Sequence, residues 1–142
     1  MAKVSKEYLQ HLAEVPLFAQ CDTRELEIIA GLGTEITVPE GRVLAKEGDQ
    51  AHEAFLVMDG EATCTVNGEV VARFGPGDFF GEMALIAHKP RTATVVADTE
   101  MTLRVFHVTE FNRLMEETPS IAVKILTATA QRLLNAEVSP TH

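Results

Sequence analysis

The sequence predicts an α+β protein that is mainly β, built as an antiparallel β-roll or jelly-roll-like barrel with flanking N-terminal and C-terminal helices. Between residues 34 and 107, apolar residues recur with a period of two in short segments, and Gly-containing turns separate these segments. On both sides of this region the apolar residues recur at helical spacing. Short, regularly spaced strands with glycine at the corners are typical of small barrels and rolls.

Length and composition limit the classes of function. A chain of 142 residues with 46% hydrophobic and 23% charged residues fits one globular domain, which we expect to span residues 1–142. No apolar run approaches the roughly 18 to 20 residues that a membrane-spanning helix needs, and the N-terminal residues have no apolar core of a signal peptide. We therefore expect a cytoplasmic location. The formal net charge of −9 argues against nucleic-acid binding by this chain.

Two short helices are expected over residues 5–33. The first runs over 5–13, where Ser5 can cap and the apolar residues share one face, and Pro16 and Leu17 end it. The second starts at Asp22 or Thr23 and closes at the glycines of 31–33.

The β-roll is expected over residues 34–107. Its strands are predicted at 36–38, 43–45, 53–58, 62–66, 70–74, 92–97 and 101–107. Asn67-Gly68 joins two of these strands, and this dipeptide predicts a hairpin with a type I′ turn. Two C-terminal helices follow over 109–135, the first capped by Thr109 and the second beginning at Pro119.

The stretch 75–95, GPGDFFGEMALIAHKPRTATV, has the parts of an anion-binding site. A helix that starts at Gly81 or Glu82 would direct unpaired backbone N–H groups at whatever lies before it. Arg91, held by the preceding proline, could donate two hydrogen bonds to the same anion, and the small residues at 92–94 leave room beside it. The residues alone leave open an alternative in which Glu82 and Arg91 form a salt bridge with each other.

Other chemistries find little support in the sequence. Cys21 and Cys64 match no zinc spacing, and the histidines at 52, 88 and 107 lack the close spacing of a cupin-type metal site. No acid and base pair accompanies Arg91, so we expect a binding protein rather than an enzyme, with no cofactor and no metal. A cupin-type barrel enzyme is the alternative that this spacing disfavours.

The segment FGEMALIAHKPRTATV resembles the phosphate-binding cassette of cyclic nucleotide-binding domains, as found in cyclic-AMP-dependent kinase regulatory subunits, nucleotide-gated channels and catabolite activator proteins. The resemblance extends to the turn at 39–41, the corner at 47–49, the turn at Gly60 and the flanking helices, from about Val15 to Asn135. It implies a β-roll whose last helix acts as a lid over a bound cyclic nucleotide.

The resemblance also implies roles for single residues. Arg91 would hold the phosphate together with the backbone N–H groups around Gly81, Met83 and Ala84. Glu82 would accept a hydrogen bond from the ribose 2′-hydroxyl. Thr92, beside the small Ala93, stands where relatives contact phosphate or guanine. The resemblance therefore leaves the identity of the purine base undecided, with cyclic AMP slightly favoured over cyclic GMP.

The base pocket and the lid are less defined by the sequence. Leu56, Val71 and Leu85 could form an apolar wall. Arg132 is a candidate lid contact, although an arginine on a solvated helix face is the favoured interpretation.

The resulting hypothesis is a sensor domain whose C-terminal helices shift when a cyclic nucleotide binds. Its output would require a protein partner or an effector domain in another chain, or a homodimer through the last helix. The alternative is a degenerate interaction module that binds a protein partner and no nucleotide, with the Glu82–Arg91 ion pair holding it together.

Overall fold

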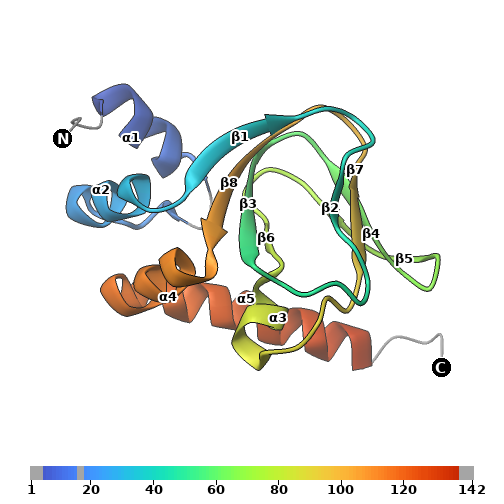
Figure 1. The fold of residues 1–142 in the computed structure, drawn as a ribbon. Helices are drawn as coiled ribbons and strands as arrows, with labels where there is room; N and C mark the ends of the chain where they lie inside the picture. The colour runs from blue at the N-terminus through green and yellow to red at the C-terminus, as the bar shows by residue number, and fades with distance from the viewer. Residues whose placement is uncertain (1–4, 16–17, 138–142) are drawn as a thin grey trace.

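The computed structural model describes residues 5–15 and 18–137, and for residues 135–137 it describes the backbone alone. Figure 1 shows two sheets that form a roll, with the helices gathered at one side of it and along one end. The helices are α1 Lys6–Ala13, α2 Thr23–Gly31, α3 Glu82–Ala87, α4 Val108–Glu117 and α5 Pro119–Glu137. The break predicted at Pro16 and Leu17, and the ends of the predicted 1–142 domain, lie outside the described residues.

Each of the two sheets has four strands, and the predicted mainly β architecture is confirmed. The first sheet has the order β1-β8-β3-β6 and the second has the order β2-β7-β4-β5. All strand pairs are antiparallel. The strands are β1 Thr34–Val38, β2 Val43–Ala45, β3 Glu53–Asp59, β4 Ala62–Val66, β5 Glu69–Phe74, β6 Phe79–Phe80, β7 Thr94–Ala97 and β8 Met101–His107.

The β4–β5 hairpin turns at Asn67 and Gly68, as predicted. Their φ angles are 52° and 84°, and a type I′ turn requires positive φ at both central positions. Asn tolerates this conformation and Gly adopts it without strain, so the dipeptide fixes where the chain reverses.

The central strand β3 contributes to two separate hydrophobic cores. Its residues Ala54, Leu56 and Met58 pack against the helices, whereas Phe55 and Val57 point into the space between the two sheets. Alternate residues of a strand face opposite sides, so the sequence of a strand that is buried on both faces is a continuous run of apolar residues.

The helix α4 begins one residue earlier than predicted, and its cap is His107 rather than Thr109. The His107 ring nitrogen accepts from the Thr109 N–H at 3.5 Å, and Glu110 accepts from the His107 N–H at 3.0 Å. The other Glu110 oxygen accepts from the Gly33 N–H at 2.9 Å. This glutamate therefore ties the start of α4 to the end of the N-terminal helical pair.

A buried arginine attaches the N-terminal helices to the roll. Arg104 on β8 donates from Nε to the Leu32 carbonyl at 3.1 Å and from Nη2 to the Ala30 carbonyl at 2.6 Å. It also donates to the Tyr8 hydroxyl and lies over the Tyr8 ring. The carbonyls at the C-terminal end of α2, which the helix itself cannot satisfy, are thus paired.

Helix α5 passes along the end of the roll beside α3, as Figure 1 shows. None of the helices in the described part of the chain is long and apolar enough to cross a membrane.

Candidate functional site

The backbone of Arg91 is fixed by the corner at Gly48 and Asp49. The Arg91 N–H donates to the Asp49 carbonyl at 2.8 Å, and the Arg91 carbonyl accepts from the Gly48 N–H at 2.9 Å. The loop after α3 is therefore hydrogen-bonded on both sides of this residue, so its side chain starts from a defined position.

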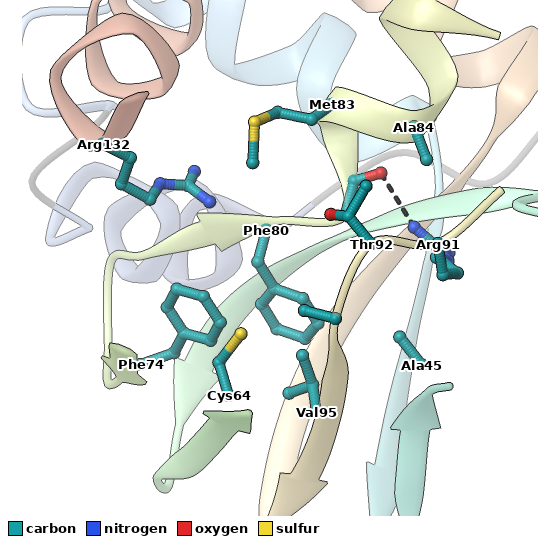
Figure 2. Close-up of a pocket in the computed structure, with 12 residues that line it drawn as sticks. Ala45, Cys64, Phe74, Phe80, Met83, Ala84, Arg91, Thr92, Val95 and Arg132 are labelled. Atoms are coloured by element: carbon teal, nitrogen blue, oxygen red, sulfur yellow. Dashed lines mark hydrogen bonds between the residues drawn. The ribbon is translucent and has the colours of Figure 1, made fainter. Parts of the chain in front are cut away.

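The Arg91 side chain is turned toward the roll and is only 6% exposed. Nη1 donates to the Gly81 carbonyl at 2.8 Å, drawn as the dashed line in Figure 2, and Nη2 donates to the Glu53 carbonyl at 2.6 Å. The Glu53 carboxylate lies 3.8 Å from Nη2. Burial lowers the pKa of Arg91, while Glu53 and Glu82 oppose that shift. A guanidinium has five N–H donors, so two carbonyl contacts leave capacity for an anion.

Gly81 caps α3 and permits this arrangement. Its φ is 85°, in the left-handed region that favours glycine. A Cβ added here would lie 2.8 Å from Arg91 Nη1 and 3.4 Å from the Glu53 carbonyl oxygen. Glycine is therefore needed both for the conformation and for the close approach of the guanidinium.

Glu82, the first residue of α3, is fully buried beneath α5. Its Oε2 accepts from Arg132 Nη2 at 2.8 Å and from the Thr129 hydroxyl. Its Oε1 is also buried and has no hydrogen-bond partner among the described residues. The salt bridge that the sequence left open between Glu82 and Arg91 is not formed, because each of these residues is paired elsewhere.

Arg132 reaches the cassette instead of lying on a solvated helix face, so the favoured sequence interpretation was wrong. Its Nη2 also donates to the Phe79 carbonyl at 2.6 Å, and its guanidinium lies 5.7 Å from the centre of the Phe74 ring. The sequence alone could not indicate this contact, because it depends on how α5 crosses the end of the roll.

A small pocket of about 60 Å³ lies between the cassette, the inner face of the second sheet and Arg132. Figure 2 shows Met83 and Arg132 on one side of it, with Phe74, Cys64 and Val95 across from them. Its lining combines seven residues named from the sequence with five others. The former are Gly81, Met83, Ala84, Arg91, Thr92, Ala93 and Arg132; the latter are Ala45, Cys64, Phe74, Phe80 and Val95.

Comparison with known proteins decides the family. A family model described as the cyclic nucleotide-binding domain matches residues 35–118, which is more than half of the chain. The chain belongs to the cyclic nucleotide-binding domain family. Domains of this family are regulatory binding modules, and the fold and the cassette described above are those of such a domain.

Two curated relatives and one solved structure illustrate the match to this family. A cyclic nucleotide-gated potassium channel of Rhizobium etli is 37% identical over 87% of this chain and 34% of its own length. A cAMP-dependent protein kinase regulatory subunit of Schizosaccharomyces pombe is 37% identical over 76% of this chain and 26% of its own length. A structure of PKAR CBD2 bound to Sp-2Cl-cAMPS superimposes with a TM-score of 0.78 and 26% identity, covering 96% of this chain and 93% of that one. The chain thus spans about a third or less of the curated relatives.

Three residues predicted to line the base pocket of this cyclic nucleotide-binding domain lie elsewhere. Leu56 and Leu85 are buried in the core between the first sheet and the helices, and Val71 is 58% exposed on the outside of β5. For Leu56 and Val71 the reason is strand parity: Phe55 faces the space between the sheets and Leu56 does not, just as Ala72 and Phe74 face inward and Val71 does not. Leu85 lies on α3, on the face that packs into the helical core. The same alternation could have identified Cys64 and Phe74 as pocket residues.

The cysteines and histidines do not form a metal site within the described residues. No group of three or more His, Cys, Asp or Glu side chains could hold a metal ion there. Cys64 lines the pocket and Cys21 packs at the edge of the helical core, both as free thiols. Burial raises the pKa of both thiols.

Proposed function

We propose that this cyclic nucleotide-binding domain is a non-catalytic sensor, with cyclic AMP slightly favoured over cyclic GMP, whose C-terminal helices shift when the ligand binds. The observation that carries the proposal is the placement of Arg91. Its backbone is clamped at the 48–49 corner and its guanidinium is fixed by carbonyls of Gly81 and Glu53, at the wall of the pocket.

Arg91 would bind the cyclic phosphate. A fixed guanidinium requires little reorganisation when an anion arrives, and burial strengthens its interaction with that anion because water screens it less. The backbone N–H groups around Gly81, Met83 and Ala84 would contribute further donors. Because the net charge of the chain is −9, attraction of the phosphate depends on this local arrangement rather than on the overall field.

Glu82 would accept a hydrogen bond from the ribose 2′-hydroxyl. Its buried Oε1 lacks a partner among the described residues, and a buried unsatisfied carboxylate oxygen is costly, so a hydroxyl donor there would be favourable. This contact would distinguish a ribonucleotide from its 2′-deoxy form.

The base preference rests on Thr92 and on the relatives. Thr92 lines the pocket, where its hydroxyl could contact phosphate or a guanine amino group. The fission yeast relative is named a cAMP-dependent kinase regulatory subunit, and the PKAR CBD2 structure holds Sp-2Cl-cAMPS. These two names support cyclic AMP.

Ligand entry would require α5 to move. Pockets that enclose small molecules typically measure about 300–1,000 Å³, whereas the pocket here measures about 60 Å³ and Arg132 forms part of its wall. The nucleotide would therefore bind when α5 is displaced, and α5 would then close over it.

Titration calorimetry with cyclic AMP and with cyclic GMP tests the proposal. The wild type should bind at least one of the two nucleotides, with a higher affinity for cyclic AMP than for cyclic GMP. Arg91→Ala should lose most of this affinity. Arg113→Ala is the matched control, since Arg113 is exposed and, within the described part of the chain, its ion pair is with Glu117 of its own helix, at 2.9 Å. No binding of either nucleotide would refute the proposed function, and binding that survives Arg91→Ala would refute the role of that residue.

Binding without turnover can be checked in the same samples. Incubation with the bound nucleotide followed by chromatography should recover it intact, because the Glu82 carboxylate is engaged by Thr129 and Arg132 and the Glu53 carboxylate lies 3.8 Å from the Arg91 guanidinium. Conversion of the nucleotide to its monophosphate would contradict this part of the proposal.

A protein partner or effector domain in another chain would receive the signal through α5. Exposed apolar residues recur along this helix at Val123, Leu126, Leu133 and Leu134. Their spacing is that of a helix–helix contact surface. A homodimer is one form of this contact, and light scattering of the wild type and of Leu126→Glu would show whether two copies associate. The cytoplasmic location stays a prediction.

The small pocket and the internal pairing of Glu82 favour a second candidate, an interaction module that binds no nucleotide. The Glu82–Arg91 ion pair expected for such a module is absent; Glu82 pairs with Arg132 instead. If calorimetry detects no heat of binding with either nucleotide, the result would favour this candidate.

A further inference from the structure

A second hollow, larger than the pocket described above, lies between α3 and α5. It measures about 610 Å³, within the range of about 300–1,000 Å³ that is typical of small-molecule sites. Seven of its ten lining residues are apolar. The largest of these are Met83, Ile86, Leu126 and Leu133. We propose that this α3–α5 groove binds a free long-chain fatty acid, with the hydrocarbon chain between the two helices and the carboxylate beside Lys89.

The groove is distinct from the pocket that Arg91 lines. Met83, Ala84 and Thr92 line both hollows and so form the wall between them. Arg91 and Arg132 line the smaller pocket but not the groove. Binding of a fatty acid in the groove is therefore independent of the proposed nucleotide site.

Helix α5 has a second apolar face that the roll does not cover. Ile125 is buried in the helical core, whereas Leu126 and Leu133 are 47% and 52% exposed. These two leucines lie seven residues apart, about two helical turns, so they share one side of the helix. Ile86 of α3, which is 42% exposed, lines the same hollow. Exposed apolar residues from two elements that meet around one hollow indicate a binding surface.

The size of the hollow favours a hydrocarbon chain over a partner helix. Ten residues of helix span about 15 Å with a diameter of about 10 Å, a volume of about 1,200 Å³, which is about twice that of the groove. Ala84, Ala87 and Ala130 each contribute only a methyl group to the lining, so the space between the longer side chains stays open. A flexible chain can lie within this space, whereas a helix could only rest on its rim. Val123 and Leu134, which are exposed on α5 and do not line the groove, remain for a protein partner.

Lys89 supplies the charge that selects an anionic head group. Among the described residues that line the groove it is the sole charged one, in a chain with 21 Asp and Glu residues against 12 Lys and Arg. Glu82, the buried carboxylate beneath α5, is paired with Arg132. Physiological salt screens exposed charges beyond about 8 Å, so the Lys89 ammonium, rather than the net charge of −9, determines which head group is favoured here. The lysine stem can lie along the apolar lining while its ammonium stays in water beside the carboxylate.

Titration calorimetry of the 142-residue chain with myristate, below the concentration at which this fatty acid forms micelles, tests the proposal. Myristate should bind, and the affinity should rise about two- to fourfold for each methylene added from decanoate to myristate, because each methylene is withdrawn from water. Tetradecyltrimethylammonium has a chain of the same length and the opposite charge. It should bind about three- to tenfold more weakly than myristate, because Lys89 repels it.

Two exposed leucines of α5 give a matched pair of variants. Leu133 lines the groove and Leu134 does not, although their exposed fractions are 52% and 55%. Leu133→Ser should weaken myristate binding about five- to tenfold through lost apolar contact, and Leu134→Ser should bind as the wild type. Lys89→Gln should weaken myristate binding about threefold and should not weaken binding of tetradecyltrimethylammonium.

Several outcomes would overturn the proposal. These are no binding of myristate below its micelle-forming concentration, or wild-type affinity in Leu133→Ser. Equal affinity of the wild type for myristate and its cationic counterpart would refute the role of Lys89. Binding to phosphatidylglycerol vesicles without binding of monomeric myristate would assign the groove to a membrane surface instead. A wild-type dimer that Leu133→Ser dissociates in sedimentation, without myristate binding, would make the groove an interface between two copies. Myristate binding without binding of either cyclic nucleotide would refute the proposed function and leave the groove as a fatty-acid site.

Discussion

Replacing Gly81 by alanine tests how the cassette positions its arginine. Two effects combine in this variant. The first is conformational, since a residue with a Cβ at a φ of 85° is disfavoured by about 1–2 kcal/mol. The second is the contact of the new Cβ with Arg91 Nη1, which would lie at 2.8 Å. Arg91 must shift, and its hydrogen bond to the Gly81 carbonyl is lost or weakened.

Gly41 separates the two effects. Its φ is 89°, almost the same, but a Cβ there would meet nothing within 4 Å. Gly41→Ala should therefore lower the free energy of unfolding by about 1–2 kcal/mol through the conformational effect alone. Gly81→Ala should lower it further, by up to about 1.5–3 kcal/mol, the typical contribution of a hydrogen bond to a charged group.

Nucleotide affinity should separate the two variants more clearly than stability does. Gly41 is not part of the pocket lining, so Gly41→Ala should bind as the wild type. In Gly81→Ala the displaced guanidinium no longer meets the phosphate correctly, and a loss of about 1.4–2.8 kcal/mol corresponds to roughly tenfold to hundredfold in Kd. Urea denaturation and calorimetry on both variants measure the two quantities. Wild-type affinity in Gly81→Ala would refute the argument that this glycine positions Arg91.

Three further predictions concern groups around the site. Arg104→Met should lower the free energy of unfolding by about 1–3 kcal/mol for each of the carbonyls of Ala30 and Leu32 that loses its donor, without changing nucleotide affinity, and denaturation with calorimetry checks both. Tyr8, the only tyrosine, should ionise near pH 12 in an ultraviolet titration, because burial raises its pKa to about 12, with Glu35 adding to the shift and Arg104 opposing it. Its raised pKa means that the stabilisation from the neutral phenol is present below pH 10 and is lost as the pH rises through 12; ionisation near pH 10 would contradict the packing of α1. In a Cys21→Ser background, Cys64 should react slowly with a maleimide at pH 8, because burial raises its pKa, and more slowly still with bound nucleotide because it lines the pocket. An unchanged rate with nucleotide would place the ligand elsewhere.

Much of the fold could be predicted because it depends on local patterns. The period-two segments, the Asn67-Gly68 turn and the helix that begins after Gly81 each reflect steric or hydrogen-bonding preferences of neighbouring residues. The pairing of Arg91 with an anion site was suggested in the same way, because Gly81, Glu82 and Arg91 lie within eleven consecutive residues.

The parts that the sequence did not indicate are contacts between distant segments. Thr129 and Arg132 reach Glu82 across 47 and 50 residues, and Glu53 reaches Arg91 across 38. Nothing near Arg132 in the sequence distinguishes it from a solvated arginine. The exclusion of Leu56 and Val71 from the pocket depends on which face of each strand turns inward, which is settled only when the sheets pack.

The sequence by itself therefore determined the β-roll, the cassette and its resemblance to a nucleotide-binding family, because short-range sterics, periodicity and a contiguous motif carry that information. Only the tertiary structure decided the partners of Glu82, the position of Arg132 and the small size of the pocket. These depend on where α5 crosses the roll, and that crossing is set by the burial of Ile121 and Ile125 in the helical core. Packing between elements, rather than any local preference, places α5 over the Glu82 carboxylate.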